Sequence, residues 1–339
     1  MSETTQAEGK RAAMDFKEVT VRYAEDMARV EKDIQRHFSS DVALIPAVSG
    51  YLIGGGGKRI RPLLLIVSSR LCGYTGSTRQ ITNSVVAEYI HAATLLHDDV
   101  VDEADTRRGS ASANAKFGNE ASVLVGDFLF AKSFDLMSAD GDIRVIRAMS
   151  TATKCLAEGE VLQLVNTCNL EVSNEAYMDT IYRKTGALIE ACCRVGAMLG
   201  GAQEERENAL ARYGKNIGVA FQLVDDALDY VGEAKSWGKP LGADLVDGKV
   251  TMPLIHALAA ANERENTIIA EAIEQEGSAS DKLGAVMPIL EKRGSIIHTM
   301  DMARDYAEEA KSAIASLFPP SDHLEALHYI AEYIVSRNV

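Results

Sequence analysis

Apolar residues along this chain recur at steps of three and four positions and seldom alternate with polar ones. That spacing puts them on one face of a 3.6-residue helix, whereas a half-buried strand would repeat every second residue. Only seven prolines are present to interrupt such segments. The pattern therefore predicts an all-α fold, with helices near residues 15–38, 41–52, 61–72, 80–104, 119–139, 143–168, 174–200, 204–232, 251–262, 281–292, 294–317 and 321–336.

The pattern also predicts a single helical domain behind a short tail. Residues 1–14 are expected to be a disordered tail and residues 15–339 the domain, because no linker rich in proline or serine divides them. Apolar runs such as residues 63–67 fall far short of the roughly 18–20 residues that cross a bilayer, and the N-terminal stretch lacks the apolar segment of a signal peptide. We therefore expect a cytoplasmic protein without a transmembrane segment.

Composition narrows the function classes. The 339 residues are 47% hydrophobic, which is ample for a sizeable core. A net charge of -14 argues against nucleic-acid binding, and it means that an anionic substrate would need a local cluster of cations or a metal. The five cysteines lack the paired spacing of a metal site, and the adjacent Cys192 and Cys193 fit a helix in the core better than a disulfide.

Acidic side chains gather directly after one apolar segment, in the stretch LLHDDVVDEADTRRG at residues 95–109. Asp98, Asp99 and Asp102 stand there, and no lysine or arginine lies between Arg79 and Arg107 to offset their charge. His97 precedes them, and we interpret it as a packed histidine and not as a ligand.

The same spacing returns in FQLVDDALDY, residues 221–230, as Asp225, Asp226 and Asp229. Again no basic residue lies between Lys215 and Lys235. On a helix the first and last aspartate of each triplet share a face, and the middle one lies about 100° around the axis.

Two interpretations of the triplets are open. An acidic run is most often a solvated helix face, but like charges four residues apart cost about 0.2–0.5 kcal/mol, and exposed helices usually offset them with lysine. Because the uncompensated pattern occurs twice, each time after an apolar segment, we favour a bound cation. Carboxylates without cysteine or histidine select a hard ion, and Mg²⁺, completed by water and phosphate oxygens, fits better than a calcium loop. Mn²⁺ is an alternative.

Basic residues that suit a phosphate occur in three places. The stretch GGGGKRIRP, residues 54–62, sets Lys58 and Arg61 at the expected start of a helix, where backbone N–H groups attract anions. By itself a glycine run with basic residues is more often a surface loop, and arginine after Gly-Lys excludes a Walker A motif. The other two places are the pair Arg107 and Arg108 and a set of three lysines, Lys184, Lys239 and Lys249.

Five motifs in fixed order, spanning roughly residues 50–260, resemble those of the trans-isoprenyl diphosphate synthases: GGGGKRIRP, LLHDDVVDEADTRRG, KTG, FQLVDD and GKPLGADLVDGKVTMP. Within that family the chain is most similar to the long-chain enzymes that supply quinone side chains, such as octaprenyl and decaprenyl diphosphate synthases. The resemblance implies the isoprenoid synthase fold, a bundle of long helices around a deep central cavity, usually as a homodimer.

The resemblance also implies roles for individual residues. Both triplets would bind the Mg²⁺ ions that hold an allylic diphosphate, a farnesyl or geranylgeranyl primer, and three basic residues would contact that diphosphate: Arg107, Lys184 and Lys239. Isopentenyl diphosphate would lie on Lys58, Arg61, His91 and Arg108, where the family often has glutamine at the position of His91. Thr185 and Gln222 would lie beside the reacting carbons, and Lys249 belongs to the substrate-binding set.

Small residues before the first triplet predict a long product. Ala93 and Thr94 stand where short-chain members of the family tend to carry aromatic plugs, so the tail could extend back along the helix. One helical turn rises about 5.4 Å, close to one extended isoprene unit, which suggests roughly eight to ten units. Tyr89, or the three phenylalanines at 128, 130 and 134, could form the floor, although such aromatics more often pack in a core or a dimer interface. The product would partition into a membrane.

Two rival functions remain at this point. A terpene cyclase uses the same trigger but typically lacks a second cationic pocket, whereas this chain has Lys58, Arg61 and Arg108. A non-catalytic subunit of a heteromeric synthase usually shows damaged triplets, and both are intact here.

Overall fold

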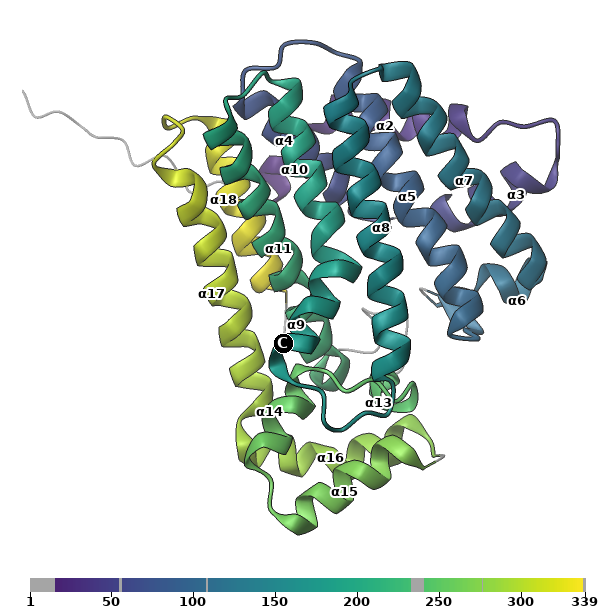
Figure 1. Cartoon of the computed structure of the whole chain (residues 1–339), viewed down its shortest axis with the longest axis vertical. Helices are drawn as coiled ribbons and strands as arrows, with labels where there is room; N and C mark the ends of the chain where they lie inside the picture. Colours follow the sequence, from purple (N-terminus) through teal and green to yellow (C-terminus); the bar gives the residue numbers. More distant parts are fainter. Residues whose placement is uncertain (1–15, 55–56, 108, 233–240, 276, 338–339) are drawn as a thin grey trace, which may run out of the picture.

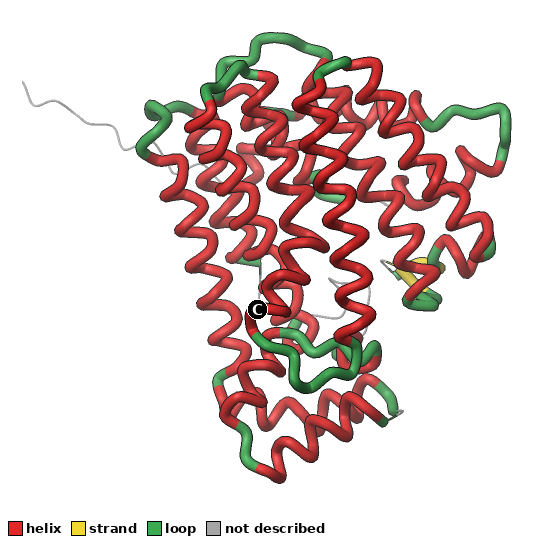
Figure 2. The backbone as a smooth tube through the Cα atoms, viewed as in Figure 1, coloured by secondary structure: helices red, strands yellow, loops and turns green. Residues whose placement is uncertain are grey.

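The computed structural model describes residues 16–54, 57–107, 109–232, 241–275 and 277–337, and nearly all of them lie in helices (Figures 1 and 2). The first elements are α1 (Phe16–Arg22), α2 (Ala24–His37), α3 (Leu44–Gly54), α4 (Ile60–Leu71), α5 (Arg79–Val101), β1 (Thr106–Arg107), β2 (Ser110–Ala111), α6 (Ala113–Phe117), α7 (Asn119–Asp140) and α8 (Ile143–Asn166). The remaining elements are α9 (Asn174–Ile181), the π-helical turn η1 (Tyr182–Gly186), α10 (Ala187–Leu199), α11 (Glu204–Val231), α13 (Ala243–Val246), α14 (Met252–Ala260), α15 (Glu263–Glu274), α16 (Ala279–Arg293), α17 (Ser295–Ala315) and α18 (Asp322–Val335).

The all-α prediction is confirmed, with corrections to single elements. The helix expected at 15–38 is two helices divided at Tyr23, and the one expected at 174–200 contains the π-helical turn η1. Helix α15 was not predicted, although Asn262 and Glu265 form a capping box at its start. The short helices α6 and α13 and the two-residue strands β1 and β2 were also missed, because elements of two to five residues carry no periodicity.

Two hydrophobic clusters form the core. The larger is built mainly from α4, α5, α7, α10 and α18, and the smaller from α9 and α13 to α16. The long helices α11 and α17 pack along each other and contribute buried residues to both clusters. In Figure 1 they run side by side from the main bundle down to α14. Because the same two helices carry both cores, the smaller group of helices is fixed against the bundle.

Two glycines bring η1 close to its neighbours. A Cβ atom on Gly218 of α11 would lie 2.5 Å from the Cα atom of Gly186, and one on Gly159 of α8 would lie 2.7 Å from the backbone nitrogen of Lys184. Both contacts are to backbone atoms, which cannot rotate away as a side chain could. The turn that carries Lys184 and Thr185 is therefore held between α8 and α11 at distances that only glycine allows.

We predict that Gly218→Ala lowers the free energy of unfolding by about 1–3 kcal/mol, because the added methyl group forces α11 away from η1. The control is Gly284→Ala, on the exposed side of α16, where a Cβ meets nothing within 4 Å. That variant should gain about 0.4–1 kcal/mol through reduced chain entropy. Urea unfolding measures both, and equal stability of the two variants would contradict the close packing of η1.

Candidate active site

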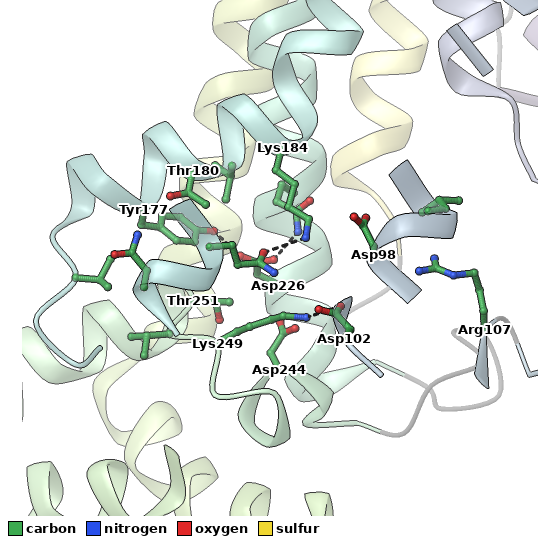
Figure 3. Close-up of a pocket in the computed structure, with 17 residues that line it drawn as sticks. Asp98, Asp102, Arg107, Tyr177, Thr180, Lys184, Asp226, Asp244, Lys249 and Thr251 are labelled. Carbon is green, nitrogen blue, oxygen red and sulfur yellow. Dashed lines mark hydrogen bonds and ion pairs between the residues drawn. The ribbon is translucent and has the colours of Figure 1, made fainter. Parts of the chain in front are cut away.

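A pocket of about 250 Å³ opens beside the C-terminal ends of α5 and α11. Four carboxylates and three cationic side chains line it, as Figure 3 shows: Asp98, Asp102, Asp226, Asp244, Arg107, Lys184 and Lys249. Apolar side chains share the wall, namely Leu95, Val172, Ile181 and Val250. The two acidic helices, more than a hundred residues apart in the chain, therefore face one common space.

The first triplet divides between the pocket and the protein interior. Asp98 and Asp102 line the pocket, whereas Asp99, whose side chain is fully buried, accepts from the guanidinium of Arg107. The Nε and Nη2 atoms of Arg107 lie 2.7 and 2.6 Å from Asp99 Oδ1. The β1–β2 hairpin, in which Arg107 pairs with Ser110, directs this arginine back toward α5. Arg107 thus neutralises Asp99 and still reaches the pocket.

The second triplet is distributed differently. Asp226 lines the pocket, and Asp225 instead pairs with Arg337, whose Nη1 lies 2.9 Å from Asp225 Oδ1. Asp229 accepts a hydrogen bond at 3.1 Å from the backbone N–H of Asp244, at the start of α13. Burial raises the pKa of Asp225 to about 6 in spite of Arg337. The metal roles predicted for all six aspartates stay predictions, and the structure shows that their surroundings differ.

Lys184 of η1 pairs with two side chains of α8. Its Nζ lies 2.9 Å from Glu160 Oε2 and 3.1 Å from Gln163 Oε1. Burial, together with the negative charge of Glu160, raises the pKa of Asp98 to about 7, although Lys184 opposes the shift. In a protein without bound substrate or metal, Asp98 is therefore only partly ionised near neutral pH.

Lys249 approaches the pocket from the loop after α13. Its Nζ lies 3.3 Å from Asp102 Oδ2 and 2.8 Å from Asp247 Oδ2. Burial alone would lower the pKa of Lys249, but the carboxylates of Asp102, Asp247 and Asp244 outweigh it and raise the pKa. Lys249 therefore stays protonated, and in Figure 3 it reaches across to Asp102.

The residues predicted to hold isopentenyl diphosphate lie at the start of α4 and on α5. Lys58 Nζ sits 4.8 Å from the ring centre of Tyr333. The Nε atom of Arg61 is buried without a hydrogen-bond partner among the described residues, as expected of a donor that serves a ligand. His91 is half-buried on α5. Two predicted residues, Arg108 and Lys239, lie outside the described residues.

Arg59, from the same motif GGGGKRIRP, forms contacts that hold helices together. Its guanidinium lies 2.6 Å from Glu31 Oε1 and 2.8 Å from Glu88 Oε2, and it also donates to the carbonyl of Ile53 at 2.9 Å. Its backbone has φ of 47°, in the left-handed region. This network ties α2, α3 and α5 to the start of α4, between the two cations Lys58 and Arg61.

The positions predicted to set chain length are not among the residues that line the described pocket. Ala93 is fully buried, and the hydroxyl of Thr94 donates to the carbonyl of His91. The pocket wall is formed instead by Leu95. His97 packs over Gly126, where a Cβ would lie 2.2 Å from its Nε2 atom, as expected of a packed histidine. The role of Ala93 and Thr94 stays a prediction.

The donor set suits a hard divalent cation that is shared with a phosphate. No group of three or more histidine, cysteine, aspartate or glutamate side chains converges on a metal site within the part of the chain that the structure describes. Mg²⁺ commonly takes only one or two carboxylates from a protein and completes its octahedron with water and phosphate oxygens. The carboxylates of Asp98, Asp102 and Asp226 around one pocket fit that arrangement.

Across the described residues, no helix combines the length and apolarity that spanning a bilayer requires.

Several residues around the pocket were missed by sequence reasoning. Glu160 and Gln163 belong to the stretch EGEVLQ, residues 158–163. Its glycine and acids form a local pattern that could have been added to the set of motifs. Asp244 lies within the quoted GADL motif but was not singled out. Tyr177 and Arg337 carry no local signal, because each is recognisable only through a partner far away in the chain.

We predict that Asp98→Asn stabilises the metal-free protein increasingly as the pH rises. The folded pKa of Asp98 is about 7 against an ordinary 3.8, so between these values the folded state holds a proton that the unfolded state has released. Stability from this group is therefore present at low pH and lost as the pH rises toward 7. With these pKa values, melting in EDTA should show the advantage of the variant growing by about 2–3 kcal/mol between pH 5 and pH 8. A constant difference across that range would show that Asp98 does not carry this shift.

Comparisons with known proteins identify the family of this chain. A family model described as polyprenyl synthetase matches residues 42–290. The octaprenyl diphosphate synthase of Haemophilus influenzae is 43% identical, over 97% of this chain and 99% of that protein, and that of Escherichia coli K12 is 42% identical over 96% and 100%. A polyprenyl synthase from Caulobacter crescentus, solved with calcium and isoprenyl diphosphate, shares 39% identity with a TM-score of 0.92 over 97% of this chain and 100% of that one. The structure of a decaprenyl diphosphate synthase from Rhodobacter capsulatus shares 41% identity with a TM-score of 0.89, over 95% of this chain and 99% of that one. The predicted family is thereby confirmed, and the chain belongs to the polyprenyl synthetase family.

Proposed function

We propose that this chain is a trans-polyprenyl diphosphate synthase, which adds successive isopentenyl diphosphate units to an allylic primer and releases a long-chain product. The observation that carries the proposal is a pocket in which acids from two distant helices meet cationic side chains against an apolar wall. Diphosphate and hydrocarbon therefore find complementary surfaces side by side.

The two substrates would occupy different parts of the site. The allylic diphosphate would lie at the pocket between the two triplets, with Arg107, Lys184 and Lys249 around it. Lys239 would join this set. Isopentenyl diphosphate would lie against Lys58, Arg61, His91 and Arg108. The buried unpaired Nε of Arg61 supports an anion at that position, because a desolvated guanidinium donor without a partner is costly.

The reaction begins with cleavage of the allylic C–O bond. Mg²⁺, or Mn²⁺ in its place, held by the aspartates of the two triplets would offset the charge of the departing diphosphate. Lys184 and Arg107 add fixed positive charge at the same place, and at 4 Å with an effective dielectric of about 20 one such pair is worth about 4 kcal/mol. The double bond of isopentenyl diphosphate then attacks the allylic cation, and the released diphosphate takes the proton that is lost.

The relatives, and the small residues before the first triplet on α5, support the proposed product length. The similar proteins named above are octaprenyl and decaprenyl diphosphate synthases, which supports a product of roughly eight to ten units. Such a chain suits a quinone side chain and would pass into a membrane, while the enzyme itself works in the cytoplasm with a farnesyl or geranylgeranyl primer.

We expect the purified chain to convert labelled isopentenyl diphosphate and farnesyl diphosphate, with Mg²⁺, into products of about eight to ten units. Chromatography of the dephosphorylated products measures their length. Ala93→Phe should shorten the product because the ring would block the path along α5, and melting shows whether that variant is folded. Cyclic products, or turnover only with a second protein present, would contradict the proposal. An unchanged length in a folded Ala93→Phe variant would exclude this path for the tail.

A homodimer accounts for exposed apolar side chains on α7 and α8. Leu124 is 67% exposed on α7, and Val161, Leu164 and Val165 are 54–71% exposed on α8. A soluble monomer seldom exposes so many large apolar groups on two neighbouring helices. The double variant Leu124→Glu/Val165→Glu should therefore sediment as a monomer. Ile297→Glu, which changes a similarly exposed residue on α17, should leave the dimer intact. Equal sedimentation of all three proteins would refute this interface.

A further inference from the structure

A continuous series of hydrogen bonds connects α9, α11 and η1 along a wall of the pocket, which Tyr177, Gln222 and Asp226 help to form. The hydroxyl of Tyr177 donates to Asp226 Oδ2 at 2.5 Å, and the amide nitrogen of Gln222 donates to Asp226 Oδ1 at 2.7 Å. The hydroxyl of Thr185 in turn donates to Gln222 Oε1 at 2.9 Å. In Figure 3 the hydroxyl of Tyr177 points directly at Asp226. Four side chains from three elements are thus joined in one path.

The path is buried and has a defined direction. Tyr177 is 5% exposed, Asp226 is 4% exposed and Thr185 is 7% exposed, so water cannot easily replace a lost partner. The hydroxyl of Tyr177 is the donor in its contact with Asp226. In the structure both oxygens of Asp226 accept, and the amide of Gln222 turns its nitrogen to Asp226 and its oxygen to Thr185.

That direction fixes what Thr185 offers to its surroundings. Its hydroxyl hydrogen is committed to Gln222, so the oxygen presents lone pairs to any other neighbour. Lone pairs carry partial negative charge, which stabilises a nearby carbocation. If the amide of Gln222 turned over, it would present N–H groups to Thr185, and the hydroxyl hydrogen would be free to point elsewhere.

We propose that Tyr177 is a positioning residue for prenyl transfer, which acts through Asp226 and Gln222 to hold the hydroxyl of Thr185 in the orientation that favours the allylic cation. The inference rests on the proposed places of Thr185 and Gln222 beside the reacting carbons. Without the phenol hydroxyl, the carboxylate of Asp226 loses one of its two side-chain donors, so it can rotate and holds the amide of Gln222 less firmly.

The test is Tyr177→Phe, which removes one hydroxyl and keeps the ring. We expect the single-turnover rate of condensation to fall about five- to tenfold, as loss of one hydrogen bond in the transition state would give. The KM values for both substrates should stay within about twofold of the parent, because the hydroxyl hydrogen of Tyr177 is donated to Asp226 and is not available to a diphosphate. This split between rate and KM separates positioning from substrate binding.

The matched control is Tyr213→Phe. Tyr213, on α11, is fully buried and donates its hydroxyl to the carbonyl of Leu327 at 2.6 Å. Both variants lose one buried hydrogen bond and should melt at similarly lowered temperatures, but only Tyr177→Phe should lose rate. Equal rates for the two variants, with equal melting temperatures, would show that Tyr177 serves the fold alone.

A double-mutant cycle tests whether Tyr177 acts through Thr185. In a Thr185→Ala background, Tyr177→Phe should cause less than a twofold further loss, because the group that it positions is gone. Multiplied losses, or a change in KM with the rate unaltered, would overturn the proposal. These outcomes are distinct from failure of the proposed function, since in that case the parent chain itself would make no linear prenyl product.

Discussion

The proposed site depends on several carboxylates that the protein partly buries in one pocket and does not fully neutralise with its own cations. Asp98, Asp102, Asp226 and Asp244 share one pocket. Burying a carboxylate in a low-dielectric site is costly unless opposite charge or hydrogen bonds compensate it. The raised pKa values of Asp98 and Asp226 express that cost directly. A ligand that brings positive charge into the pocket therefore lowers the free-energy cost of these buried carboxylates.

The rest of the fold maintains this charged pocket. The long helices α11 and α17 connect the two hydrophobic clusters, so the C-terminal half of α11 is supported from both sides. Gly159 and Gly218 let α8 and α11 close on η1, which places Lys184 and Thr185 in their positions. A π-helical turn inserts an extra residue in a helix and redirects the side chains around it, and such turns are frequent at functional sites. The cationic side of the pocket thus depends on backbone packing as much as on charge.

Sequence reasoning found what repeats or stands close together in the chain. The helical periodicity, the two triplets and the basic motifs are local patterns, and the all-α fold and the shared pocket followed from them. What it missed depends on long-range geometry: Glu160 beside Lys184, Tyr177 beside Asp226, and Arg337 beside Asp225. No sequence pattern near Arg337 indicates that it pairs with Asp225, which lies 112 residues earlier. Helix α15 is a different case, since its capping box was present in the sequence and its apolar stripe was simply short.

The two triplets share one spacing but not one environment. On α5 the first and last aspartates face the pocket and the middle one is paired with Arg107, as their positions around a helix require. On α11 the middle aspartate, Asp226, faces the pocket. Since the spacing is the same, the difference must lie in how each helix is rotated about its axis relative to the pocket. Identical motifs therefore present different members to the substrate, and the role of each aspartate has to be argued from its own contacts.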